Sequence, residues 1–194
     1  MPRRVLLAFD TPADRHQARL VRDSLAGSGW AAACLPDAAG AAAPALLEAA
    51  IRPCSALCVL TGAETALRPW IRRAALAAFV AQKVVLEITL EGPAGPSVLA
   101  RLGYRATGSP YGVYEFREEY VERDAAGDWV PHPDIAPVEM GEYIQNRPAP
   151  GVQPLDGRCP RHRWAEDGPQ QIAAWLQAAE AARPPWARDP DEIT

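Results

Sequence analysis

The sequence predicts an α/β fold in which helices cover both faces of a parallel sheet. Three observations support this class. In the first 90 of the 194 residues, short apolar runs alternate with stretches of helical periodicity. The connections between them are short, so each strand is followed by a helical crossover, which places neighbouring strands parallel. Hydrophobic residues make up 48% of the chain, enough for a sheet that is buried on both sides.

Four strands are predicted in this first half, each a continuous apolar run typical of a doubly covered strand. They span residues 4–9, 30–35, 56–60 and 83–90, and the second is weaker because it is mostly alanine. The helices between them span 11–26, 45–51 and 65–82. The first helix begins at Thr11-Pro12, with proline at its first position, and ends before Gly27. The pattern is that of a doubly wound, flavodoxin-like sheet, whose ligands bind at the carboxyl ends of the strands.

The second half is richer in proline, glycine and aromatic residues. The stretch over residues 111–130 is rich in Tyr, Phe, Val and Trp, and its segments 120–123 and 128–130 are joined by 124–127, which predicts an antiparallel β-hairpin. An apolar stripe predicts a closing helix over 170–182. We expect a single domain over residues 1–182, with the sheet in 1–90 and the hairpin, loops and closing helix in 91–182. Residues 183–194 are expected to form a flexible tail.

Composition excludes several classes of partner. The formal net charge is -4, and no basic run is longer than Arg72-Arg73, which argues against a nucleic-acid surface. No apolar run approaches the roughly 18 residues that span a bilayer. The first apolar run breaks at Asp10, too early for a secretory leader, and four cysteines are few for a disulfide scaffold. We therefore expect a cytoplasmic protein with neither a membrane nor a nucleic-acid partner.

Several well-known sites are absent from the sequence. The turn after the first strand, Phe9 to Ala13, has no glycine with which to approach a pyrophosphate. No phosphate loop or nucleophile elbow occurs. The third strand ends in Leu60-Thr61-Gly62, where a response-regulator receiver carries its aspartate. Cys159 and His162 have a metal-like spacing but no second pair, so no metal site is expected.

Other segments match a known pattern at scattered positions along most of the chain. The first strand ends in Phe-Asp and is followed by an Asp-Arg pair, and the third strand is followed by Gly, Thr and Trp. The matching segments are Arg4 to Asp10, Asp14-Arg15-His16, Cys58 to Gly62, Thr65, Trp70-Ile71, Lys83-Val84-Val85, Trp129-Val130-Pro131, Arg163-Trp164, Ile172 and Trp175. Together they resemble the TIR-like domains of the Thoeris anti-phage type.

The resemblance implies a TIR-like, flavodoxin-like fold in a bacterial signalling or anti-phage defence protein. It implies no required cofactor, NAD as substrate or ligand, and self-association or a protein partner. The nucleotide-binding residues that it implies are Asp10, Thr11, Asp14, Arg15, Thr61, Gly62, Thr65, Trp70, Arg73 and Ala74. We expect Asp10, Thr61 and the turn around Ala74 to converge on one cleft.

The same resemblance casts doubt on catalysis. Enzymatic TIR domains cleave the nicotinamide–ribose bond of NAD with a carboxylate that stabilises an oxocarbenium-like transition state. The family places this Glu four residues after the Trp, on the same helical face, and here the position is Ala74. Arg72 and Arg73 can bind phosphate but cannot replace a carboxylate. Glu64, in the loop after the third strand, is the nearest substitute, and its alternative role is that of a solvated loop acid.

Three functions therefore stay open: an impaired nucleotide-binding domain, an active NAD glycohydrolase or cyclase that uses another acid such as Glu64, and a non-enzymatic interaction module. Two of the site residues also have structural alternatives. Asp10 is either a pocket acid or the N-cap of the first helix, and capping is favoured. Arg15 contacts a phosphate or forms a surface ion pair, and the ion pair is the default.

Overall fold

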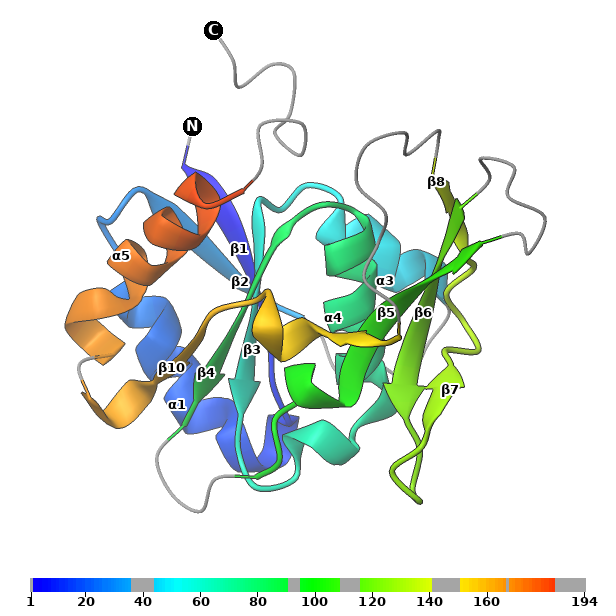
Figure 1. Cartoon of the computed structure of the whole chain (residues 1–194). Coiled ribbons are helices and arrows are strands. Elements are labelled where there is room, and N and C mark those ends of the chain that lie inside the picture. The colour runs from blue at the N-terminus through cyan, green and yellow to red at the C-terminus, as the bar shows by residue number, and fades with distance from the viewer. Residues whose placement is uncertain are drawn as a thin grey trace, which may run out of the picture. The chain divides into compact units, whose positions relative to one another are not determined.

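A computed structural model describes residues 2–35, 44–90, 95–108, 116–140, 151–166 and 168–183 (Figure 1). The chain divides into two compact units. The first comprises Met1–Val98 and Cys159–Thr194, and the second, Leu99–Arg158, is inserted between these two stretches of sequence. The single domain expected over residues 1–182 stays a prediction. Of the expected tail, residues 184–194 lie outside the described residues.

The first unit is built on a five-stranded parallel sheet. Its strands are β1 (Arg3–Ala8), β2 (Trp30–Cys34), β3 (Ala56–Thr61), β4 (Val84–Thr89) and β10 (Arg161–Arg163), in the order β10-β4-β3-β1-β2. Every neighbouring pair is parallel. The four predicted strands are confirmed, and no end differs by more than one residue. The fifth, β10, was not predicted because its sequence, Arg-His-Arg, has no apolar residue.

Helices cover both faces of this sheet, as the doubly wound class requires. The four α-helices among the described residues are α1 (Thr11–Ser24), α3 (Pro44–Ile51), α4 (Pro69–Val80) and α5 (Gly168–Ala181). Helix α1 lies beside α5 on one face, and α3 lies beside α4 on the other (Figure 1). The helix expected over 65–82 is divided into a 3-10 turn, η1 (Thr65–Leu67), and α4. Arg68 between them is extended (ψ 110°) because it precedes Pro69.

The alternation of strand side chains separates two kinds of face. Leu7, Leu60 and Leu86 belong to the apolar core shared with α1 and α5. The residues that alternate with these leucines along each strand point to the other face, toward α3 and α4. Among them, Thr61 and Glu87 are polar, and both are almost fully buried. Buried polar side chains on this face therefore extend to the end of β3, beside the loops at the carboxyl edge of the sheet.

The short strand β10 and the turn that follows it, η4 (Trp164–Glu166), connect the sheet to the closing helix. His162 stacks on Trp175 of α5, with ring centroids 4.3 Å apart and planes at 4°. Trp164 is 3% exposed and joins the apolar core. The closing helix predicted over 170–182 is thus confirmed as α5. No helix in the described segments is long and apolar enough to cross a membrane.

The second unit is an antiparallel sheet of short strands. Its elements are η2 (Leu99–Arg101), β5 (Leu102–Gly108), β6 (Phe116–Arg123), β7 (Trp129–Pro131), β8 (Val138–Met140), β9 (Gln153–Pro154) and η3 (Leu155–Gly157). The sheet order is β7-β6-β5-β9, and β8 also pairs with β6. The predicted hairpin is confirmed, since Arg123 pairs with Trp129. Gly127 turns the hairpin with φ +92°, and the Asp124 carboxylate accepts hydrogen bonds from two amides of the turn.

Candidate functional site

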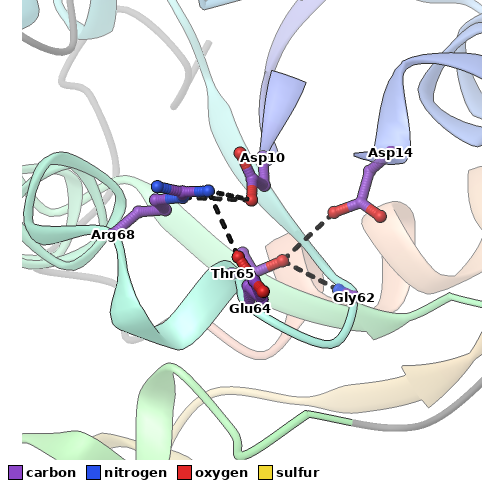
Figure 2. A network of polar contacts seen from close by, with 6 residues as sticks. All are labelled: Asp10, Asp14, Gly62, Glu64, Thr65 and Arg68. Atoms are coloured by element: carbon purple, nitrogen blue, oxygen red, sulfur yellow. Dashed lines mark hydrogen bonds and ion pairs between the residues drawn. The ribbon is translucent and has the colours of Figure 1, made fainter. Parts of the chain in front are cut away.

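The candidate site lies where the strand order reverses. From β1 the chain crosses to β2 through α1, whereas from β3 it crosses to β4 through α4 on the other face. The loops that follow β1 and β3 therefore diverge, and ligands of open α/β sheets bind at such a point. Polar groups from these two loops and from the first turn of α1 form a network (Figure 2). Its members are Asp10, Asp14, Gly62, Glu64, Thr65 and Arg68.

One half of the network is centred on Arg68. Its Nε and Nη2 donate to Oδ2 of Asp10 at 3.0 and 2.8 Å, and Nη2 also lies 3.4 Å from Oε2 of Glu64. The Asp10 carboxylate, by hydrogen bonding and by its charge, raises the pKa of Arg68. The Asp10 side chain is 8% exposed, against 42% for Arg68 and 66% for Glu64. Arg68 thus contacts one buried acid, Asp10, and one exposed acid, Glu64.

The contact with Arg68 corrects the prediction that Asp10 caps the first helix. Asp10 occupies the N-cap position of α1, but its side chain makes no capping hydrogen bond. A guanidinium is a stronger partner for a carboxylate than a backbone amide is, because both groups carry charge. Arg68 was missed by the sequence analysis. Its only signal was a basic residue directly before the proline that opens a helix.

The other half of the network is centred on the Thr65 hydroxyl, which is fully buried. It accepts a hydrogen bond from the Gly62 amide at 2.8 Å and donates to Oδ2 of Asp14 at 3.2 Å. Burial raises the pKa of Asp14, and the hydrogen bond from Thr65 opposes that rise. A side chain at Gly62 would collide with the Asp14 carboxylate, whose carbon lies 2.9 Å from the position of the missing Cβ. Glycine at 62 thus allows α1 and the loop after β3 to meet.

Thr61 makes its side-chain hydrogen bond to a residue outside this network. It is 1% exposed, and its hydroxyl donates to Oε1 of Glu87 at 2.7 Å inside the sheet. Glu87 is itself fully buried and was missed by the sequence analysis. A signal for it exists in the sequence, because it is the one acid within the apolar run from Val84 to Leu90.

The remaining predicted residues lie around this network on α1 and α4. Arg15 is exposed on the first turns of α1, and the side chain of Thr11 lies outside the described residues. Trp70 and Arg73 are half-buried on α4. Ala74 is fully buried, so its methyl group packs in the interior and presents no surface to a ligand. The structure thus brings together Asp10, Asp14, Gly62, Glu64 and Thr65 from the predicted set.

The arrangement offers hydrogen-bond acceptors beside one cationic donor group. The carboxylates of Asp10, Asp14 and Glu64 can accept from hydroxyl groups, and the Arg68 guanidinium can donate to anionic oxygens. Within the described ranges, no group of three or more His, Cys, Asp or Glu side chains is placed to hold a metal ion.

Comparison with known proteins adds no relative from which a function could be transferred. No protein-family model matches the chain, and no curated protein matches its sequence.

Proposed function

We propose that this chain is a TIR-like nucleotide-binding domain of a bacterial signalling or anti-phage defence system, with impaired NAD cleavage. One observation carries the proposal: where the resemblance puts the ligand, the segments after β1 and β3 bring two sets of polar contacts side by side, Arg68 with Asp10 and Glu64, and Thr65 with Asp14 and Gly62 (Figure 2). The sheet order β2-β1-β3-β4-β10 agrees with a flavodoxin-like core, in which this edge binds the ligand.

The chemistry of the network suits a nucleotide. The exposed Glu64 carboxylate can accept hydrogen bonds from ribose hydroxyls, and so can the nearly buried Asp10 once Arg68 turns away from it. Arg68, at 42% exposure, can turn from Asp10 toward a phosphate oxygen. The first amides of α1 lie beside Asp10, at the positive end of the helix dipole.

Impaired cleavage follows from position 74. The catalytic carboxylate of the family would stand on α4 one turn after Trp70, and this chain has a buried methyl group there. The neighbouring Arg72 donates to the backbone carbonyl of Ala66 at 2.9 Å. Without a carboxylate at this position, the positive charge that develops on the ribose in the transition state lacks the group that stabilises it in enzymatic TIR domains.

A binding measurement tests the proposal. We expect NAD to raise the melting temperature of the purified chain, because a ligand that binds only the native state stabilises it by mass action. Asp10→Asn should weaken that shift, since a neutral amide oxygen is a poorer acceptor for ribose hydroxyls than the Asp10 carboxylate. Asp23→Asn is the matched control, because Asp23 is an exposed residue of α1 that pairs with Arg22. No shift with NAD, ADP-ribose or ATP at millimolar concentrations would contradict nucleotide binding and favour an interaction module.

A second candidate, an active NAD glycohydrolase or cyclase, is favoured by Glu64. It is the most exposed carboxylate of the network and lies 3.4 Å from Arg68. Nicotinamide release during incubation with NAD separates the two proposals. The impaired domain should release nicotinamide no faster than a protein-free control. Turnover that Glu64→Gln abolishes would establish the enzyme instead, and turnover that this variant leaves unchanged would remove Glu64 from the site.

A further inference from the structure

A second polar cluster lies deeper in the same unit and is joined to the segment that carries the candidate site through Thr61. Its centre is Glu87, in the middle of β4, on the sheet face that also carries Thr61. The side chain is fully buried. A buried carboxylate is expensive to desolvate, and an apolar side chain of the same size would be cheaper at this position. Its presence therefore calls for a role that a leucine could not fill.

Both oxygens of Glu87 are used. Oε1 accepts from the Thr61 hydroxyl at 2.7 Å and from the Val98 amide at 3.1 Å. Oε2 accepts from the Ser97 hydroxyl at 2.6 Å and lies 3.6 Å from Nε of Arg161. The backbone amide of Glu87 also donates to the carbonyl of Pro160. One residue thus binds three separate segments of the chain.

Each of these segments has a defined place in the chain. Thr61 begins the loop that carries Gly62, Glu64 and Thr65. Residues 97 and 98 are the last before the inserted unit begins, and residues 160 and 161 follow shortly after it ends. Glu87 is therefore the point at which the site loop meets both the entry and the exit of the insertion.

A close backbone approach strengthens this connection. The α-carbon of Gly95 packs against the backbone of the site loop, and a Cβ there would lie 2.5 Å from the carbonyl oxygen of Ala63. Any movement of the entry segment would therefore be transmitted to the loop by direct contact as well as through the carboxylate. The Leu90 amide, just beyond β4, adds a bond to the Thr61 carbonyl at 3.0 Å.

We infer that Glu87 is a positioning residue, which holds the loop after β3 in its binding shape and couples that shape to the segments that enter and leave the inserted unit. The functional part of this inference rests on the proposed nucleotide site. It follows that an event which displaces residues 97–98 or 160–161 would alter the loop without touching its ligand-facing groups. Glu87 touches no ligand itself, because it has no exposed surface.

Amide hydrogen exchange of Glu87→Gln tests the coupling. Glutamine keeps the shape of the side chain but loses the charge and one of the two acceptor oxygens. We expect exchange at Gly62 and Val98 to rise by about tenfold or more, through local opening of the segments that Glu87 holds. Val85→Ala is the matched control, because Val85 is a buried residue on the same face of β4 without a polar contact to the loop. It should lower overall stability without a selective rise at these two amides.

Two further measurements keep the inference falsifiable. Ser97→Ala, which removes only one hydroxyl at the entry segment, should also speed exchange at Gly62, on the far side of the carboxylate. In ligand titrations under conditions in which every variant is folded, Glu87→Gln should weaken NAD binding by about fivefold or more, and Val85→Ala should leave it unchanged. Equal exchange in Glu87→Gln and Val85→Ala would overturn the coupling. A wild-type chain that binds no NAD would contradict the proposed function alone, and the exchange data would still decide the coupling.

Discussion

The two polar clusters of the first unit have similar members and different surroundings. Each contains a carboxylate, a threonine and an arginine that is a little under half exposed. In the inner cluster the central carboxylate, Glu87, is fully buried, whereas the outer network, which includes Arg68, ends in the exposed Glu64. Buried charges are tolerated only when every hydrogen bond is made, so the inner cluster is fixed in one geometry. In the outer network the Arg68 guanidinium is 42% exposed, so water or a ligand can compete for it. The difference distinguishes the cluster that we infer shapes the loop from the network that we propose binds the ligand.

The largest effect should come from breaking the inner cluster. Glu87→Ala leaves the Thr61 hydroxyl, the Val98 amide and Arg161 without their shared carboxylate. We expect it to lower the free energy of unfolding by about 3–5 kcal/mol, the range for removing one partner of a buried charged cluster. Urea denaturation measures this value. A loss no larger than that of an exposed substitution such as Asp23→Asn would show that the inner cluster does not constrain the fold.

A change of intermediate size should follow the titration of Asp14, which joins α1 to the site loop. Burial raises its pKa above the unfolded value of 3.8, so the native state holds this proton more tightly than the unfolded chain does. Stability contributed by this group therefore falls as pH rises from near 3.8 through the raised native pKa. Asp14→Asn cannot titrate but keeps an acceptor for Thr65. Relative to wild type, its free energy of unfolding should increase over that interval, as urea denaturation at several pH values would measure. A pH-independent difference would contradict the raised pKa.

The smallest change in stability should come from Arg68→Gln in the outer network. The guanidinium is 42% exposed, and exposed ion pairs contribute little to folding. We expect its melting temperature to fall modestly below that of Arg22→Gln, which breaks a fully exposed pair on α1, because Arg68→Gln also leaves the nearly buried Asp10 carboxylate without its guanidinium. The NAD-induced shift in melting temperature should nevertheless be reduced in Arg68→Gln and retained in Arg22→Gln. A large loss of stability would place Arg68 with the inner cluster and weaken the comparison.

The sequence predicted the fold better than it predicted the site, for a physical reason. Strands β1, β3 and β4 are buried on both faces, which forces a continuous apolar run that is visible without any partner. Strand β10 has no such run. Its place is set by pairing with β4 and by the stacking of His162 on Trp175. That information lies in residues far away along the chain.

The candidate site likewise contains residues with a local sequence signal and contacts without one. Asp10, Asp14 and Thr65 were predicted from the resemblance to TIR-like domains, whose motifs lie close along the sequence to the ends of predicted strands. The contact between Arg68 and Asp10 joins residues 58 positions apart, and no local pattern marks it. Glu87 lay inside a run identified as a strand, and an acid in an otherwise apolar run is a sequence signal for a buried polar cluster. Whether the predicted set binds a nucleotide stays a prediction.

The short strand β10 also bears on how the first unit meets other copies of itself. It is an end strand of the parallel sheet among the described residues, and an end strand is where a strand from a neighbouring molecule could be added. Because it is only three residues long, and begins and ends with arginine, it offers an incoming strand few backbone groups to pair with. The length and composition of β10 therefore discourage extension of the sheet across it.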